Sequence, residues 1–170
     1  MMYKTSPDKI CRIITFLIGG VFLFIIFFQI LILLGAPEEP VTIPALMLVL
    51  FSFILVFTWG YAPYGYVIEK KNLNILRKLG TKSIPLSEII LVRAVEKDEM
   101  KNTWRSFGNG GVFGYYGKFR NAKFGDMVFY TRRRDILLLL ELSNGKKIIL
   151  GPDELTSFKK SLKEAISKNQ

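Results

Sequence analysis

The sequence contains no histidine and a single cysteine, Cys11. The absence of histidine excludes Ser-His-Asp and Cys-His nucleophiles and removes a usual ligand from most zinc sites. A lone cysteine cannot form an intramolecular disulfide, and this one has no base in the chain to activate it as a nucleophile. The sequence therefore predicts that the chain is not an enzyme and holds neither a cofactor nor a metal ion.

Catalysis by carboxylates alone is the remaining enzymatic alternative. Its candidates are Glu96, Asp98, Glu99 and Asp126, and their spacing is not one that such chemistry requires. Isolated carboxylates of this kind are usually solvated loop residues. The sequence favours that second interpretation for all four.

Charge is also absent from two long segments near the N-terminus. No charged residue lies between Arg12 and Glu38 or between Glu39 and Glu69. A helix that crosses the hydrocarbon core of a bilayer needs about 20 apolar residues, and each segment is long enough. Because only a short stretch separates them, the sequence predicts a transmembrane hairpin whose two ends lie on the same side. The expected helices span residues 13–34 and 41–62.

Basic residues flank this hairpin and are missing from its connecting loop. Three basic residues precede the first helix and two lysines follow the second, whereas the loop 36–40 carries two glutamates. Lys and Arg collect on the cytoplasmic side of membrane helices. We therefore expect an integral protein of the inner (cytoplasmic) membrane, with both termini and the soluble domain in the cytoplasm and a short acidic loop outside.

Alternatives exist for features of the first segment. A secretory signal peptide is disfavoured, because the apolar stretch exceeds a usual signal core and cleavage after Ala36 would place Pro37 next. Cys11, at the expected membrane edge, is either a palmitoylation site or, as we favour, a buried or interfacial thiol. Gly19 and Gly20 either permit close approach of the second helix or are simply tolerated.

After about Tyr64 the chain changes to short β-type segments and then to one amphipathic helix. The expected strands are residues 64–69, 73–79, 89–96, 127–131, 136–142 and 147–150. Asn144-Gly145, between the last two, predicts a hairpin with a type I′ turn, which needs positive φ at both central residues. Apolar residues then recur at three- and four-residue spacing, which predicts a helix over 153–167. Residues 98–125 are rich in glycine and aromatics and show no clear period.

This order of strands closed by a helix is the plan of a pleckstrin-homology-like (PH-like) domain. Segments that carry the resemblance are Ser83-Ile84-Pro85-Leu86-Ser87-Glu88-Ile89, Trp104 to Gly108, Gly114 to Phe119, Gly125-Asp126-Met127, and Ile149 to Glu154 followed by Phe158. Over roughly 64–166 the chain resembles the bacterial PH domain families, in which the domain often follows membrane helices. The resemblance implies an α+β fold, with a PH-like antiparallel β-barrel or sandwich capped by a C-terminal α-helix.

Three parts follow from this interpretation: a cytoplasmic lead at 1–12, the hairpin at 13–63 and the PH-like domain at 64–170. The resemblance implies a non-catalytic binding or assembly module that engages a protein partner, its own copies or anionic lipid. The alternative is a small-molecule sensor or enzyme accessory subunit that uses the loop 104–119 as a pocket. A deep pocket with converging polar groups would favour that alternative.

Two groups of side chains are candidates for lipid or partner binding. Anionic lipids attract cations near the membrane by about 1 kcal/mol each, and exposed apolar rings mark interaction surfaces. The basic candidates are Lys118, Arg120, Lys123, Arg132, Arg133 and Arg134, and the aromatic candidates are Trp104, Phe107, Tyr115 and Tyr116. We expect the three consecutive arginines between two strands, with side chains in solvent. The alternatives are a basic tip that only aids solubility and topology, and rings that pack in the core.

Two further classes of ligand are disfavoured. Segment 108–114 superficially suggests a nucleotide-binding loop, but such a loop lies between a strand and a helix, and no helical period follows. The glycines then serve bends or bulges in strands. A basic, aromatic domain also suits nucleic acid, but a membrane anchor and the lack of a recognised motif disfavour that partner.

Overall fold

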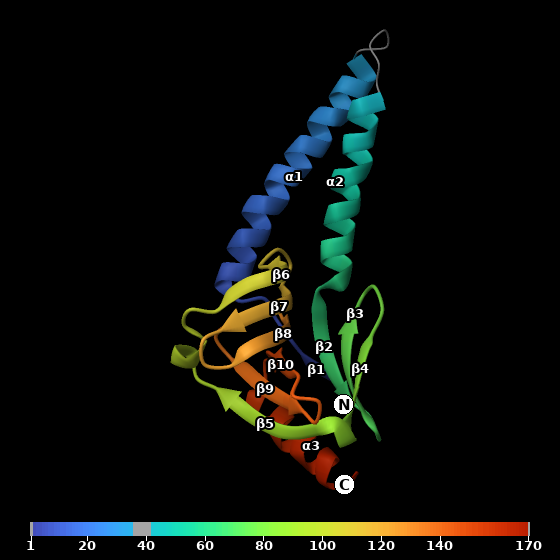
Figure 1. Cartoon of the computed structure of the whole chain (residues 1–170). Coiled ribbons are helices and arrows are strands. Elements are labelled where there is room, and N and C mark those ends of the chain that lie inside the picture. The colour runs from blue at the N-terminus through green and yellow to red at the C-terminus, as the bar shows by residue number, and fades with distance from the viewer. Residues whose placement is uncertain (1, 36–41, 170) are drawn as a thin grey trace.

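A helical hairpin stands on a β-sandwich in the computed structural model, which describes residues 2–35 and 42–169 (Figure 1). The helices α1 (Lys9–Gly35) and α2 (Thr42–Tyr61) are 27 and 20 residues long, and both are apolar enough to cross a membrane. They lie close together at the ends away from the sandwich and diverge toward it. The predicted acidic loop, 36–40, lies outside the described residues.

Two details of α1 differ from the simplest expectation. The helix begins at Lys9, before the predicted membrane segment, because the Asp8 carboxylate accepts a hydrogen bond from Cys11 N at 2.7 Å and caps the first turn. A side chain at Gly19 or Gly20 would meet no atom within 4 Å. The alternative in which these two glycines permit close helix packing is therefore wrong.

The sandwich consists of two sheets. The first has the strand order β1-β2-β3-β4, and its strands are β1 (Met2–Lys4), β2 (Pro63–Ile68), β3 (Asn72–Arg77) and β4 (Lys82–Pro85). The second has the order β5-β9-β10-β8-β7-β6, and its strands are β5 (Ile89–Val95), β6 (Trp104–Gly110), β7 (Tyr115–Asn121), β8 (Gly125–Thr131), β9 (Leu137–Leu142) and β10 (Lys147–Leu150).

Three short or terminal helices complete the domain: η1 (Leu86–Glu88), η2 (Lys97–Met100) and α3 (Leu155–Ser167). The predicted α+β fold with a C-terminal helix is confirmed, as an open two-sheet sandwich and not a closed barrel. The strands pair antiparallel except β8 and β10, which are parallel. The expectation of a purely antiparallel arrangement is wrong at that pair, because β10 enters the sheet between β8 and β9.

The β9–β10 hairpin forms where Asn144-Gly145 predicts it, but its turn is not type I′. Gly145 has a φ of 76°, whereas Asn144 is not at positive φ. The Asn144 side chain accepts a hydrogen bond from Lys146 N at 3.0 Å. Leu142 N donates to Lys146 O at 2.9 Å and closes a loop of three residues, 143–145, which needs left-handed backbone at the glycine alone.

Two hydrophobic clusters hold the sandwich together. The first draws on both sheets and α3, and it contains the fully buried Tyr66 and Phe158. The second covers the other face of the larger sheet and contains Phe129 and Cys11. Because Cys11 is fully buried, the interpretation as a buried thiol holds and palmitoylation of this residue is disfavoured.

The N-terminal lead is part of the domain. Tyr3 of β1 packs edge-on against Phe158 with ring centroids 5.0 Å apart, and its hydroxyl donates to Ser161 Oγ at 2.8 Å. β1 pairs with β2, with Met2 opposite Val67. The sandwich is therefore built from residues on both sides of the helical hairpin.

Candidate functional site

The turn between β6 and β7 lies between the ends of α1 and α2 that adjoin the sandwich (Figure 1). The hydroxyl of Thr15, in α1, accepts a hydrogen bond from Phe113 N at 2.7 Å and donates to Gly111 O at 3.3 Å. On the other side, the Tyr116 hydroxyl donates to Thr58 O of α2 at 2.8 Å. The glycine-rich segment 108–114 thus couples the domain to both helices, and a strand, not a helix, follows it.

Two residues of this turn adopt a backbone that side chains rarely permit. Gly111 has a φ of 141°, and a Cβ there would lie 2.8 Å from the Ile14 Cδ1 atom. Phe113 has a φ of 61°, and its carbonyl accepts a hydrogen bond from Arg132 Nε at 3.0 Å. The glycine is required for close approach, and the phenylalanine is held by hydrogen bonds at both its N–H and its carbonyl.

One side of the β6–β7–β8 ladder is uncovered, and we call it the open face. The strand register places Trp104 opposite Arg120 and Phe107 opposite Lys118, and directly opposed residues point to the same side. The Phe107 side chain is 75% exposed and Trp104 is 53% exposed. β6 forms the edge of its sheet and lies next to the helices in Figure 1. The open face comprises Trp104, Phe107, Tyr116, Lys118, Arg120, Asp126, Val128 and Tyr130, and Tyr130 is partly buried against the first hydrophobic cluster.

The structure thus brings five predicted residues together on the open face, namely Trp104, Phe107, Tyr116, Lys118 and Arg120. Arg120 Nε lies 3.5 Å from the Asp126 carboxylate in an exposed pair. Such surface pairs are worth little, so Arg120 stays available to an external anion. Aromatic and cationic side chains therefore share one surface beside the helices.

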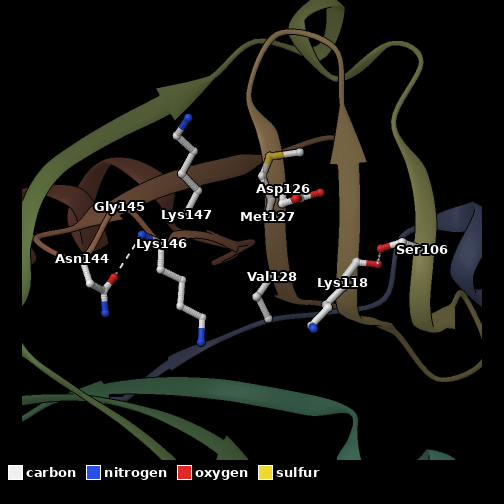
Figure 2. Close-up of a pocket in the computed structure, with 9 residues that line it drawn as sticks. All are labelled: Ser106, Lys118, Asp126, Met127, Val128, Asn144, Gly145, Lys146 and Lys147. Atoms are coloured by element: carbon white, nitrogen blue, oxygen red, sulfur yellow. Dashed lines mark hydrogen bonds between the residues drawn. The ribbon is translucent and has the colours of Figure 1, made fainter.

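The open face continues into a hollow of about 580 Å³ beside Val128 (Figure 2). The side chains of Lys118 and Lys146 lie on either side of Val128 and point the same way, while Lys147 points away. Lys147 Nζ donates to Phe124 O at 2.9 Å. Within residues 2–35 and 42–169, neither Lys118 nor Lys146 forms an ion pair. Sequence reasoning missed Lys146, although the predicted hairpin turn contains it.

Tyr115 does not belong to this surface. It is adjacent to Tyr116 in β7, so it points to the covered face, where it is 2% exposed. Burial, and then the nearby Asp8 carboxylate, raise the pKa of its hydroxyl above the ordinary value. Tyr115 is therefore a core residue, which agrees with the alternative that aromatic rings of this segment pack in the core. It is not available as a surface contact.

The three consecutive arginines are largely engaged within the protein. Arg133 is paired on both sides: its Nε donates to Asp135 at 2.7 Å and its Nη1 donates to Asp153 at 2.7 Å. Its side chain is only 16% exposed, and hydrogen bonding to Asp135 raises the pKa of its guanidinium. The Arg134 guanidinium lies over the Tyr115 ring at 5.5 Å. The expectation that all three side chains reach solvent is wrong for Arg133.

Lys123 lies at yet another place, in the turn between β7 and β8. Its Nζ donates to Glu99 at 2.7 Å, and Arg93 donates to the same carboxylate at 3.1 Å. Hydrogen bonds from Lys123 and from Glu96 N lower the pKa of Glu99 from 4.5 to about 2. Since Lys123 precedes β8 and Arg132 follows it, they are about 20 Å apart along the strand. The six predicted basic residues therefore do not line one edge.

A second hollow, also of about 580 Å³, lies between the last turns of α2 and the β6–β7 pair. Its lining is mainly apolar and carries two cations that sequence reasoning missed, Arg77 and Arg105. Gly108 and Gly117 line it as well, and a Cβ on Gly108 would lie 2.8 Å from the Gly117 Cα atom. The aromatic and hydroxyl lining residues are Phe57, Thr58, Tyr61, Phe107, Tyr116 and Tyr130.

The described part of the chain, 2–35 and 42–169, contains no group of three or more Cys, Asp and Glu side chains that could hold a metal ion. The main features of the protein are a sandwich capped by α3, an exposed aromatic and basic face, and two apolar helices. Together they define a PH-like module for binding or assembly. The family of bacterial PH domains matches residues 64–166, from β2 to α3. The chain belongs to this family.

No curated protein and no solved structure matches the chain. PH domains are generally non-catalytic binding modules, and the two apolar helices are consistent with a membrane anchor. The family therefore supports a binding or assembly role in general.

Proposed function

We propose that this protein is a non-catalytic binding module whose open face contacts anionic lipid at the membrane that holds α1 and α2. The observation that carries the proposal is the exposure of Trp104 and Phe107 beside Lys118 and Arg120, on the strands next to the helices. Aromatic rings prefer the headgroup level of a bilayer. Each cation near an anionic surface contributes about 1 kcal/mol.

The attachment of the domain to the helices supports this role. Hydrogen bonds join Thr15 to Phe113 and Tyr116 to Thr58, so the β6–β7 pair is held at the ends of both helices. A surface held beside the bilayer binds it as an intramolecular contact, so weak affinity for lipid is sufficient. The contact would fix the orientation of the sandwich and so determine which surfaces a protein partner or a second copy can reach.

We further propose that the domain faces the cytoplasm. The support is the basic flanks of the hairpin, with Lys4, Lys9 and Arg12 before α1 and Lys70 and Lys71 after α2. The proposed parts are the hairpin at 13–63 and the PH-like domain at 64–170, to which the lead 1–12 contributes β1. A reporter fused after Gln170 should be active in the cytoplasm, and activity only outside it would contradict this topology.

The intrinsic fluorescence of Trp104 tests the lipid contact. The chain has two tryptophans, so a Trp59→Phe variant leaves Trp104 as the reporter. In nanodiscs with brominated lipids, we expect Trp104 to be quenched more strongly when the bilayer is anionic. The difference should shrink with added salt, because screening acts over about 8 Å at physiological ionic strength.

Matched variants locate the contact. Lys118→Gln combined with Arg120→Gln should reduce quenching in anionic discs. Lys160→Gln combined with Lys168→Gln removes one exposed charge from α3 and one from the residue after it, at the opposite end of the domain, and should leave the quenching unchanged (Figure 1). Equal quenching in neutral and anionic discs would refute the lipid role and leave a protein partner or self-assembly as the better account of the open face.

A pocket formed by the loop 104–119 remains the second candidate function, and the hollow beside α2 specifically favours it. Arg105, Phe107 and Val112 line that hollow. Its walls are apolar and its charged groups are two arginines, which suits an amphiphilic anion and not a polar metabolite.

A further inference from the structure

We infer that the hollow between α2 and the β6–β7 pair binds one anionic phospholipid of the adjoining bilayer, with its phosphate on Arg77 and Arg105 and its upper acyl chain against the aromatic wall. This inference rests on the proposed membrane anchoring. Phe107, Tyr116 and Tyr130 of the open face also line the hollow, so Arg77 and Arg105, which are not part of that face, are the residues that distinguish the two contacts.

The position of the hollow determines which molecules reach it. Phe57, Thr58 and Tyr61 form one wall and belong to the last two turns of α2. If α2 spans the membrane, these residues lie at the headgroup level of the leaflet beside the domain. A lipid of that leaflet then lies next to the hollow and enters it without leaving the bilayer.

The charge of the hollow selects the headgroup. Within residues 2–35 and 42–169, neither Arg77 nor Arg105 has a carboxylate within 4 Å. Arg77 Nε donates to Gly80 O at 3.1 Å and its guanidinium carbon lies 5.1 Å from the Tyr61 ring centroid, which fix its position. Guanidinium groups present paired N–H donors that match phosphate oxygens. Two unpaired arginines at an apolar hollow therefore favour an anionic ligand over a zwitterionic one.

The shape of the hollow suits part of a lipid. Gly108 and Gly117, with φ of 112° and 110°, line the hollow and have no side chains of their own to occupy it. The volume of about 580 Å³ falls within the usual range of ligand sites. It is smaller than a whole two-chain phospholipid, so the phosphate and the upper part of one chain occupy it while the rest stays in the bilayer.

Native mass spectrometry of the full chain in mild detergent tests the inference. The protein is titrated with phosphatidylglycerol and, separately, with phosphatidylcholine that carries the same acyl chains. We expect one phosphatidylglycerol per chain and binding of phosphatidylcholine at least tenfold weaker. Arg77→Gln combined with Arg105→Gln should weaken phosphatidylglycerol at least tenfold. Lys160→Gln combined with Lys168→Gln, which removes the same charge from α3 and the residue after it, should not.

Two further variants separate lipid recognition from folding. Arg77→Lys combined with Arg105→Lys keeps both charges and should retain most of the binding. Should the double glutamine variant fail to fold, Arg105→Gln decides alone, because this side chain is exposed and the structure gives it no hydrogen bond within 2–35 and 42–169. Equal binding of the two lipids, or unchanged binding by the folded arginine variants, would overturn the inference.

The open-face variant Lys118→Gln with Arg120→Gln distinguishes this inference from the proposed function. It should lower Trp104 quenching in nanodiscs and leave the binding of a single phosphatidylglycerol intact. Loss of that single-lipid binding in the open-face variant would place the lipid on the open face and overturn the assignment to the hollow.

Discussion

The Asp8 carboxylate accepts the backbone N–H of Arg134 at 2.8 Å, and its other oxygen accepts that of Cys11 at 2.7 Å. The backbone N–H of Asp8 in turn donates to Arg132 O at 3.1 Å. One residue thus caps α1 and joins its first turn to the loop after β8. The basic loop 132–134, which in the sequence suggests a surface for anions, serves in the structure to fasten the helix to the sandwich.

Asp8→Ala should destabilise the protein by about 1–3 kcal/mol, because the cap is lost and a half-buried N–H group is left without an acceptor. Asp8→Asn should cost less, since the amide retains one acceptor oxygen. Thermal unfolding of the full chain in detergent measures both effects. Asp98→Ala is the control: its exposed pair with Lys101 at 2.9 Å should be worth about 0.5 kcal/mol or less. Equal losses for Asp8→Ala and Asp98→Ala would contradict the role given to Asp8.

Although Tyr3 precedes the hairpin, it should contribute as much to the stability of the sandwich as a core residue that follows the hairpin. Tyr3→Ala should cost about 3 kcal/mol or more, because it removes a buried ring from the cluster around Phe158. Tyr3→Phe removes only the hydrogen bond to Ser161 and should cost about 1 kcal/mol. Ser161→Ala should have the same effect, and the double variant should add little to either single variant. Additive losses would show that the two side chains do not interact.

β1 was not predicted from the sequence, because it depends on a partner strand that is distant in the chain. A three-residue strand such as Met2–Lys4 has no local period, and it forms only because β2, beyond the whole hairpin, offers it an edge. The two long helices and α3 were predicted, because their apolar spacing is a local property of the chain. The partner of Arg133 was missed for the same reason as β1, since Asp153 lies 20 residues away.

Five of the ten site residues predicted from the sequence lie on the open face, which also contains residues that were not predicted. The sequence shows that the aromatic and basic residues of 104–120 are concentrated there, but not which of them share a side. A register shift between Arg105 and Phe107 changes the alternation within β6. In β7 itself, Tyr115 and Phe119 point to the covered face and Tyr116 and Lys118 to the open face, and the order of residues alone does not decide between the two sides.

Acid should destabilise the η2 turn through Glu99. Its pKa in the folded protein is lowered from 4.5 to about 2, first by the hydrogen bond from Lys123. A lowered folded pKa means that the stabilisation is complete above the unfolded value and is lost as the pH falls toward the folded one. The melting temperature should therefore drop as the pH falls from about 4.5 toward about 2, and Glu99→Gln should reduce the slope.

Thermal melts in detergent over this range measure the slope. Asp135 and Asp153 also have lowered pKa values, Asp135 through hydrogen bonds from Arg133 and Asp153 through hydrogen bonds from Ser6 and then Arg133. Glu99→Gln should therefore leave part of the slope in place. Glu96→Gln is a useful comparison, because the pKa of Glu99 is lowered by the backbone N–H of Glu96, which this substitution keeps. An unchanged slope in Glu99→Gln would contradict the assignment.

The turn between the helices should not tolerate a side chain at Gly111. With a φ of 141° and Ile14 Cδ1 at 2.8 Å from an added Cβ, Gly111→Ala combines backbone strain with a clash against α1. We expect a loss of about 2–3 kcal/mol in thermal unfolding of the full chain. Gly125→Ala isolates the strain, because its φ is 70° and nothing lies within 4 Å of the added Cβ; it should cost about 1 kcal/mol.

Gly19→Ala completes the comparison, because it lies inside α1 and its Cβ would also meet no atom within 4 Å. Alanine is a better helix former than glycine in aqueous helices, so this change should be neutral or slightly stabilising. If the turn is coupled to α1, the loss of stability should be largest for Gly111→Ala, smaller for Gly125→Ala and absent for Gly19→Ala. If Gly111→Ala and Gly125→Ala cost the same, backbone strain alone accounts for both, and contact between the turn and α1 does not contribute to stability.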